Sequence, residues 1–324
     1  MMFLFILAGI GLGVLIYYIV SVILWINLDC DVELFIKSKF GKKISSLEGK
    51  VVWITGASSG IGKSLALLLA KNGVKLALSA RRLDELQKVK EDCLLNSRGK
   101  LKEKDILSLR MDVLEMEKHG EIFERVLKHF GRLDILVNNA GRSQRASWLD
   151  IDLEVDRAIF ELNVLSPVNL SRIVARYFIE NGIEGHIAVN ASMAALIPIP
   201  NMSSYIAAKS AINGYFHALR VEYPQIKNTV YCVGPVFTNI QLEAFTAEAN
   251  QKCGKPTPPT DKRLTSEKAA FYFAVAIANA TSLNWAGLFP FTFLTYLARY
   301  PAILDFAMKF TDFSLIRKNE KQGK

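Results

Sequence analysis

The sequence predicts an α/β fold, a doubly wound parallel sheet that follows a membrane anchor. Short continuous apolar runs, typical of strands buried on both faces, alternate with helix-length amphipathic segments. The first run leads directly into a glycine-rich turn and then a helical pattern. Ahead of it, residues 1–28 carry no charged side chain. These three features predict one sheet domain attached to a membrane.

Length and composition limit the classes of function. A chain of 324 residues, 51% of them hydrophobic, can hold one large domain with appendages. The formal net charge of +9 suggests an anionic partner, either a phosphorylated ligand or acidic lipid headgroups. The basic residues are scattered, so nucleic acid is not a predicted partner. No metal is predicted, because neither cysteines nor histidines have ligand spacing: Cys30, Cys93, Cys232, Cys253, His119, His129, His186 and His217.

The apolar amino-terminal segment, Met2 to Ile26, exceeds the roughly 20 residues that a helix needs to cross a bilayer. A cleaved signal peptide is the competing interpretation. It would have a basic start, a shorter apolar stretch and a small-residue cleavage site, none of which is evident. Trp25 stands where an interfacial aromatic belt would place it. We expect an uncleaved anchor in an intracellular membrane, the endoplasmic reticulum.

The orientation of the anchor is indicated by charge. Lysines follow the span, and the positive-inside rule then places the main domain in the cytosol: Lys37, Lys39, Lys42 and Lys43. Four sequons favour the alternative, a glycosylated lumenal domain: Asn169, Asn190, Asn201 and Asn279. Asn190 and Asn201 flank the candidate catalytic residues described below, where a glycan would block the site. We therefore expect the cytosolic orientation.

The first predicted strand, Lys50 to Thr55, runs into the glycine-rich turn. Glycines there allow a tight turn and a close approach of backbone to a pyrophosphate, and the helix that begins near Ile61 directs its amide-rich end at the negative charge. Apolar residues at helical spacing follow, which is the context that supports a dinucleotide site. The predicted cofactor-binding residues of the turn are Gly56, Ser58, Ser59, Gly60, Ile61 and Gly62.

The second predicted strand, Lys75 to Ala80, ends in Arg81 and Arg82. An NAD-preferring site carries an acidic residue there for the ribose 2′-hydroxyl. A guanidinium instead matches the oxygens of a 2′-phosphate. We therefore predict NADP (NADPH) as the cofactor. The competing interpretation is a pair of solvated arginines at a helix start.

The third and fourth predicted strands, Ile106 to Arg110 and Leu133 to Val137, deliver further cofactor contacts. Ligands lie at the carboxyl ends of strands in open α/β sheets. Asp112 and its neighbour Val113 follow the third strand, where the Asp112 carboxylate can accept from an adenine amino group. Small residues after the fourth strand leave space for the cofactor: Asn139, Ala140 and Gly141.

A fifth predicted strand, Gly185 to Asn190, brings Ser192 to the same edge, and Tyr205 and Lys209 follow. Residues four apart share one face of a helix, so the Tyr205 phenol and the Lys209 ammonium are expected to be neighbours. A nearby positive charge lowers the pKa of a phenol from its usual value of ~10. Tyr205 can then exchange a proton with a carbonyl or alcohol oxygen, while Ser192 polarises that oxygen.

Taken together, these motifs resemble the short-chain dehydrogenase/reductase family over roughly Lys50 to Ser282. The resemblance implies a Rossmann-type fold and an oxidoreductase. It makes Tyr205 the general acid/base, Ser192 the stabiliser of the substrate oxygen, and Lys209 the residue that binds the nicotinamide ribose and tunes Tyr205. It also makes Asn163 the fourth catalytic residue, which holds a water in a proton relay. Val236 and Thr238 would line the nicotinamide, in a loop that has Val233-Gly234 where the family commonly has Pro-Gly.

The predicted function is an NADP(H)-dependent carbonyl reductase or alcohol dehydrogenase of small apolar substrates such as steroids, retinoids or xenobiotic ketones. Leu196 to Met202 would form an apolar wall of the pocket, and Ile240 to Pro259 a lid, although both are also explained as ordinary loops. The alternative function is a non-catalytic dinucleotide-binding or scaffold protein. Loss of Ser192, Tyr205 or Lys209 would have favoured that alternative, and all three are present.

The sequence predicts one catalytic domain with appendages. The hydrophobic carboxyl-terminal extension is interrupted by charges and prolines, which excludes a second span. It is expected to lie on a membrane face, to cover the pocket mouth, or to pack in the core or in a homodimer. The predicted divisions are a transmembrane anchor 1–28, a linker 29–48, the catalytic domain 49–282, the extension 283–316 and a basic tail 317–324.

Overall fold

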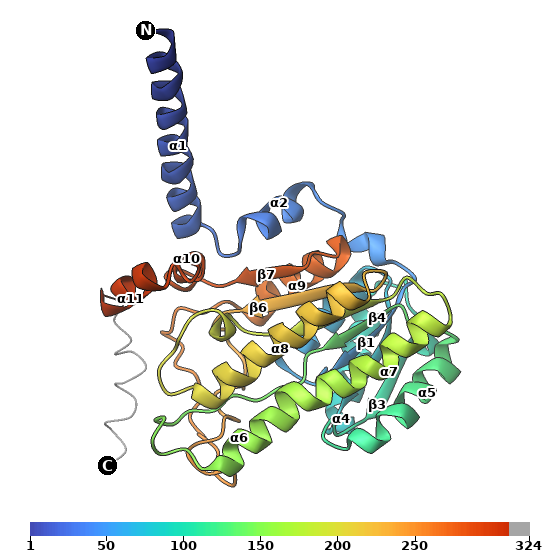
Figure 1. Ribbon diagram of the computed structural model, residues 1–324. Helices are drawn as coiled ribbons and strands as arrows, with labels where there is room; N and C mark the ends of the chain where they lie inside the picture. The colour runs from blue at the N-terminus through green and yellow to red at the C-terminus, as the bar shows by residue number, and fades with distance from the viewer. Residues whose placement is uncertain (311–324) are drawn as a thin grey trace.

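A parallel sheet with helices on both faces forms the body of the protein. The computed structural model describes residues 1–310, so the predicted tail 317–324 and the end of the extension lie outside the described residues. Within residues 1–310 the sheet has seven strands in the order β3-β2-β1-β4-β5-β6-β7 (Figure 1). The strands are β1 (Val51–Thr55), β2 (Lys75–Ala80), β3 (Ile106–Arg110), β4 (Ile135–Asn138), β5 (His186–Asn190), β6 (Lys227–Val233) and β7 (Leu283–Ala286).

All neighbouring strands pair in parallel, and the strand order reverses between β1 and β4. The predicted doubly wound sheet is thus confirmed. The helices that cover the sheet are α3 (Gly60–Lys71), α4 (Leu83–Asn96), α5 (His119–Phe130), α6 (Leu153–Phe160), α7 (Ser166–Glu180), α8 (Ser203–Glu222) and α9 (Ser266–Asn279). Short helical turns also occur at η1 (Ile44–Leu47), η2 (Glu103–Asp105) and η3 (Met116–Lys118).

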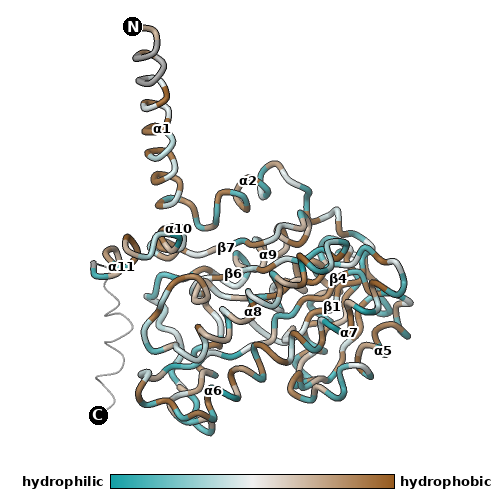
Figure 2. The backbone as a smooth tube through the Cα atoms, viewed as in Figure 1, coloured by the Kyte–Doolittle hydropathy of each residue, from teal (hydrophilic) through white to brown (hydrophobic). Residues whose placement is uncertain are grey.

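The continuous apolar runs of the sequence are explained by two hydrophobic cores, one on each face of the sheet. In β1, Val52 and Ile54 face the core formed with α3, α4 and α9, whereas Val51 and Trp53 face the core formed with α5, α7 and α8. Successive side chains of a strand point to opposite faces, so a strand covered on both sides is apolar at every position. Figure 2 shows this hydrophobic interior.

Helix α1 (Met2–Asn27) stands apart from the sheet domain and rises away from it (Figure 1). Its segment Gly9–Asn27 has a mean hydropathy of 2.3, and nearly all of its side chains are exposed. A long helix that is apolar and exposed in this way has the length and composition of a membrane span. The structure is therefore consistent with the predicted anchor.

The chain between the anchor and β1 is packed rather than extended. Helix α2 (Val32–Phe40) lies against α9, and Leu34, Ile44 and Leu47 enter the hydrophobic core. The predicted linker 29–48 is therefore part of the folded body. Its amphipathic pattern is only nine residues long, which is too short to stand out as a helix in the sequence.

The predicted division at residue 282 falls at the start of β7, and this strand pairs in parallel with β6. The sheet thus extends past that division, to Ala286. A strand of four residues shows no periodicity by which to recognise it. Helices α10 (Phe291–Leu297) and α11 (Pro301–Phe310) follow it and lie at the foot of α1 (Figure 1).

Candidate active site

The carboxyl ends of β1 and β4 are joined by hydrogen bonds. The Asn139 backbone N–H donates to Thr55 Oγ1 at 3.0 Å, and Asn139 Nδ2 donates to the Thr55 and Gly56 carbonyls at 3.0 and 3.2 Å. The Ala140 N–H also donates to Thr55 Oγ1, at 3.2 Å. The two segments predicted to bind the cofactor therefore form one rigid edge.

The glycine turn approaches this edge more closely than a side chain allows. Gly56 has φ +66°, and a Cβ there would lie 2.9 Å from Ala140 Cα. A Cβ on Gly62 would lie 2.5 Å from the Gly56 carbonyl oxygen. Helix α3 begins at Gly60, and its N-cap residue Ser59 makes no side-chain cap hydrogen bond. The amides of the first turn are thus directed at the space where a pyrophosphate would lie.

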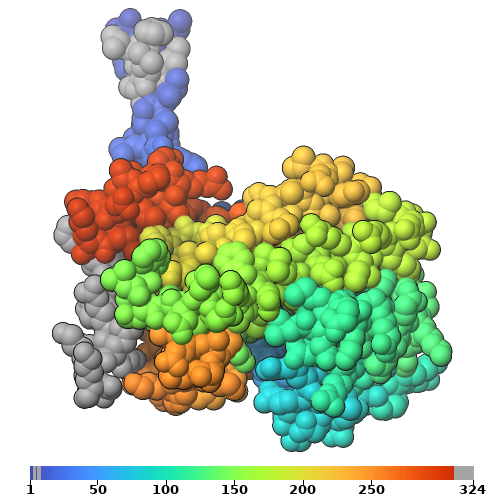
Figure 3. Space-filling model, turned by 60° about the horizontal axis from the view of Figure 1, so that its bottom comes forward, coloured from blue at the N-terminus to red at the C-terminus, as the bar shows by residue number. Residues whose placement is uncertain are grey.

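Arg81 and Arg82 are both exposed at the end of β2, and Arg82 is the N-cap of α4. Arg81 and Asp112 line a cavity of about 590 Å³ at the carboxyl end of β3. The Asp112 carboxylate accepts from the Leu114 N–H at 3.1 Å, which fixes the turn that contains Val113. Figure 3 also shows a hollow in the surface between the orange segment after β6 and the cyan and green segments. The sequence-predicted cofactor residues of β2 and β3 therefore lie at one edge.

Ser192, Tyr205 and Lys209 meet beside the end of β5. Ser192 is the N-cap of η5 (Met193–Ala195), and its Oγ accepts from the Ala194 N–H at 3.2 Å. Tyr205 and Lys209 come from the first two turns of α8 and are only 6% and 5% exposed. Lys209 Nζ lies 5.7 Å from the centroid of the Tyr205 ring and donates to the Asn190 carbonyl at 3.0 Å. The Tyr205 phenol and the Lys209 ammonium are therefore neighbours, as expected.

Burial dominates the ionisation of both groups. It raises the pKa of the Tyr205 phenol, while a hydrogen bond with Ser192 and the charge of Arg145 act in the opposite direction. Burial lowers the pKa of the Lys209 ammonium to about 8. Because burial is the larger effect, the Tyr205 phenol keeps its proton, as a proton donor must.

Asn163 reaches this site from a π-helical turn, η4 (Glu161–Leu165), between α6 and α7. Asn163 Nδ2 donates to the Arg142 and Ile159 carbonyls at 3.0 and 3.1 Å, and Asn163 Oδ1 accepts from the Arg142 N–H at 3.3 Å. A Cβ on Gly141 would lie 2.7 Å from Asn163 Oδ1 and 3.6 Å from Lys209 Nζ. Asn163 is thereby placed next to Lys209, and the π turn gives the extra residue that directs it inward.

The loop predicted to line the nicotinamide closes over the glycine turn. Val236 is buried and forms a parallel bridge with Leu264. Thr238 packs on Gly60, where a Cβ would lie 3.1 Å from Thr238 Cγ2. All residues that the sequence predicted for the site are therefore gathered at one edge of the sheet.

Two residues at this edge had no predicted role in the chemistry. Arg145 is half-buried, and its Nη1 donates to Ser143 Oγ at 3.0 Å and to the Gln144 carbonyl at 3.1 Å. Its positive charge acts to lower the pKa of Tyr205. Asn190 Nδ2 donates to Asn139 Oδ1 at 2.9 Å, and its carbonyl accepts from Lys209. The position of Asn190 at the end of a predicted strand could have indicated that it lies at the site. Arg145 lies in an irregular loop, where no sequence pattern indicates its position.

The same edge holds two buried side-chain oxygens, Gln144 Oε1 and Asn190 Oδ1, that have no hydrogen-bond partner among residues 1–310. Buried polar atoms are almost always paired. An edge with unpaired acceptors, close-packed glycines and a free helix amino terminus has room and polar groups for a bound ligand. The residues present therefore fit a dinucleotide.

Comparison with known proteins agrees with this geometry. The family described as short chain dehydrogenase matches residues 50–251. Human dehydrogenase/reductase SDR family member 7 is 39% identical over 88% of this chain and 84% of its own length. Sesamum indicum 11-beta-hydroxysteroid dehydrogenase A is 39% identical over 60% of this chain and 54% of its own length. The solved alcohol dehydrogenase of Thermococcus sibiricus has the same fold, with a TM-score of 0.64 and 24% identity over 74% of this chain and 97% of its own.

Proposed function

Because this chain belongs to the short-chain dehydrogenase family, we propose that it is an NADP(H)-dependent oxidoreductase that reduces apolar carbonyl compounds or oxidises the corresponding alcohols. The observation that carries the proposal is the meeting of Ser192, Tyr205, Lys209 and Asn163 beside the glycine turn. The direction follows the cofactor pool, and we propose reduction. The proposed location is the cytosolic side of the endoplasmic reticulum membrane.

In the proposed reduction, the hydroxyls of Ser192 and Tyr205 hold the substrate oxygen. The nicotinamide, when bound, would supply the hydride to the carbonyl carbon. As negative charge builds on the oxygen, Tyr205 Oη gives it a proton, and the charges of Lys209 and Arg145 stabilise the phenolate that remains. Asn163 holds the backbone of Arg142 and so keeps the edge beside Lys209 in place.

The surroundings of Tyr205 support an apolar substrate. Tyr205 packs in a small cluster with Ala194 and Met202, and Ile199 and Ile206 lie against that cluster. A steroid, retinoid or aromatic ketone would match this wall, whereas a sugar would leave its hydroxyls unpaired. The similarity to a hydroxysteroid dehydrogenase also supports a steroid-like substrate.

The test of the chemistry is Tyr205→Phe. We expect this variant to lose at least about a hundredfold in kcat for steroid, retinal and quinone substrates with NADPH, because removal of the phenolic proton removes general acid catalysis. The matched control is Tyr215→Phe, which changes an exposed tyrosine of the same helix and should keep the wild-type rate. Turnover that survives in Tyr205→Phe would overturn the mechanism. No turnover by the wild type with any carbonyl would favour the non-catalytic alternative.

The test of the cofactor is the double variant Arg81→Ala, Arg82→Ala. We expect KM for NADPH to rise by at least about tenfold and KM for NADH to change little, since charge-assisted hydrogen bonds to a phosphate contribute about 1.5–3 kcal/mol. Arg157→Ala, an exposed arginine paired with Glu154 on α6, is the control. Equal use of NADH and NADPH by the wild type would contradict the proposal.

A further inference from the structure

The anchor is held against the sheet domain by a set of direct contacts at its foot. The Trp25 ring of α1 stacks on the Tyr296 ring of α10, with centroids 4.5 Å apart and an interplanar angle of 13°. Thr292 Oγ1 donates to the Trp25 carbonyl at 3.3 Å. The Tyr296 hydroxyl in turn accepts from the Val32 N–H at 2.9 Å, at the start of α2. Helices α1, α2 and α10 thus meet at one joint.

The residues directly after α1 are fastened to the edge strand β7. Cys30 forms an antiparallel bridge with Ala286, and the Gly287 N–H donates to the Asp29 carbonyl at 2.9 Å. The Asp29 carboxylate lies 3.1 Å from Lys268 Nζ and accepts from the Tyr272 hydroxyl. A span attached by so many contacts cannot swivel freely, so the position of α1 in a membrane also determines which face of the sheet domain meets it.

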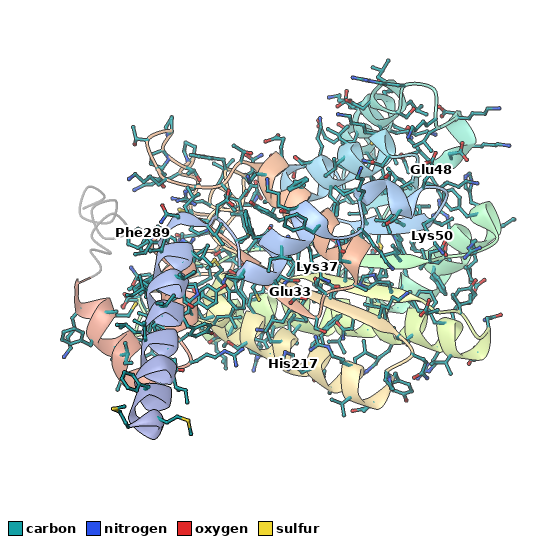
Figure 4. The ribbon with its side chains drawn as sticks, turned by 90° about the horizontal axis from the view of Figure 1, so that it is seen from above. Glu33, Lys37, Glu48, Lys50, His217 and Phe289 are labelled. Atoms are coloured by element: carbon teal, nitrogen blue, oxygen red, sulfur yellow. The ribbon has the colours of Figure 1, made fainter. Side chains whose placement is uncertain are left out.

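That face is formed by α2, α10 and α11, which lie beside the foot of α1 in Figure 1 and in the view from above in Figure 4. It carries large apolar side chains that are exposed: Ile36, Phe40, Phe289, Tyr300 and Ile303. Phe40 is 85% exposed and Ile303 51%. A patch of this kind next to a membrane span is matched by the acyl-chain boundary of the bilayer.

The charges of the same face indicate the kind of lipid. Lys39, Lys42 and Lys43 are exposed at and just after the end of α2, and none of them has an ion-pair partner in the described part of the chain. Ammonium groups directly beside a span bind anionic headgroups, which are concentrated in the cytoplasmic leaflet. The basic residues of α2, Lys37 and Lys39, lie in its last turn, next to the exposed Phe40.

This face is also connected to the candidate active site. Leu304 of α11 and Leu294 of α10 pack with Ile197, in the loop between Ser192 and Tyr205. Ile199 of that loop contacts both this cluster and the cluster that contains Tyr205. Apolar contacts therefore run without a break from α11 to the phenol.

We propose that the face formed by α2, α10 and α11 lies in the surface of an anionic bilayer, with Ile303 and Phe40 among the lipids. The inference rests on the proposed span α1. It assigns a lipid partner to the face formed by these three helices.

The test uses the full-length chain in vesicles, with an environment-sensitive nitrobenzoxadiazole label on single cysteines. Cys253 is partly exposed and is replaced by serine throughout, whereas the other three native cysteines are buried. The label positions are Ile303→Cys on α11, Phe40→Cys on α2 and, as matched control, Leu95→Cys, a 78% exposed leucine on α4 at the far side of the domain (Figure 1). Quenching by lipids with nitroxide-labelled acyl chains reports contact with the bilayer.

In vesicles that contain phosphatidylserine, we expect quenching at Ile303→Cys and Phe40→Cys at least about threefold greater than at Leu95→Cys. Equal quenching at the three positions would overturn the proposal. A label that is shielded in detergent micelles but not quenched by nitroxide lipids would also overturn it, because a second copy of the chain would then cover the face.

Charge is tested separately. With phosphatidylcholine alone, or with the variant Lys39→Gln, Lys42→Gln, Lys43→Gln, quenching at Phe40→Cys should fall at least about twofold. The control variant Lys100→Gln, Lys102→Gln, Lys104→Gln, on the α4 side of the domain, should leave it unchanged. If quenching is the same after the change of lipid and after the lysine substitutions, the anionic-lipid part of the proposal is excluded.

These outcomes are separable from failure of the proposed function. A label at Val14→Cys, in the middle of α1, reports insertion of the span itself, and its quenching without quenching at Ile303→Cys would locate the failure in the docking face. The experiment uses neither substrate nor cofactor, so an inactive enzyme would not change its result.

Discussion

At the scale of single residues, burial and charge oppose each other in the candidate site. Burial raises the pKa of Tyr205 and lowers that of Lys209, in each case because a low-dielectric surrounding penalises the charged form. The charge that acts on the phenol includes that of Arg145, from a loop far from Tyr205 in the sequence. The ease with which Tyr205 gives up a proton is thus set by the surroundings rather than by the Tyr205-x-x-x-Lys209 spacing alone.

This balance predicts a pH dependence. The pKa of Lys209 is lowered to about 8, so its ammonium is charged at neutral pH and loses the proton as the pH rises through that value. Tyr205, with a raised pKa, remains protonated over the same range. Because the positive charge stabilises the phenolate formed in the reduction, kcat/KM should fall as the pH rises through about 8.

The measurement is the pH profile of kcat/KM, which reports ionisations of the free enzyme. Lys209→Arg keeps its charge over this range and should move the fall to higher pH, whatever its effect on the absolute rate. A wild-type profile that stays flat up to the usual lysine pKa of roughly 10.4 would contradict the assignment.

At the scale of elements, the joint between the anchor and the sheet depends on one buried carboxylate. Asp31 is the N-cap of α2, and it accepts from the Leu34 N–H at 2.8 Å and from the Trp285 N–H of β7 at 2.8 Å. Asn284 Nδ2 donates to it at 3.3 Å. One side chain thus satisfies donors of both α2 and the edge strand.

We predict that Asp31→Ala lowers the free energy of unfolding by roughly 1–3 kcal/mol, because it removes a helix cap and leaves buried donors unpaired. Denaturant unfolding of the full chain in detergent measures the change. Asp152→Ala is the matched control, since Asp152 is an exposed N-cap residue of α6 without a side-chain cap bond. If the two substitutions lower the free energy of unfolding equally, the contacts of Asp31 contribute nothing to stability.

At the scale of the whole molecule, helix α1 and the sheet domain are joined into one body by the contacts at the foot of α1. Three of the four sequon side chains make hydrogen bonds within this body: Asn190 Nδ2 donates to Asn139 Oδ1 at 2.9 Å, and Asn279 Nδ2 donates to the Lys42 carbonyl at 3.1 Å. Asn169 Nδ2 donates to the Met116 carbonyl at 3.2 Å. A glycan on any of these nitrogens would break a contact of the fold.

We therefore predict that the sheet domain is cytosolic and carries no N-glycan. In sealed microsomes, added protease should degrade the domain, and endoglycosidase should leave its mobility unchanged. The substitution Arg98→Ser creates a sequon at Asn96, an exposed residue at the end of α4, and this new sequon should also remain unmodified. A glycan at Asn96, or a domain protected from protease, would show a lumenal orientation.

Much of this protein was determined by its sequence. The strands β2 and β3 begin and end where the sequence predicts, and β2 is largely apolar because it is covered on both faces. The glycine turn after β1 and the helical spacing of Tyr205 and Lys209 are also local features, and parallel strands necessarily bring their carboxyl ends to one edge. The predicted site residues could therefore be assigned to one place without coordinates.

The tertiary structure decided what depends on contacts between distant residues. Strand β7 pairs with β6, Asp29 is held by β7 and α9, and Arg145 reaches Tyr205 from a loop that has no periodicity. The π-helical turn that directs Asn163 inward likewise has no signal in the sequence. The orientation of α1 relative to the sheet domain follows from the same kind of long-range contact, because the packing of α1 on α10 fixes it.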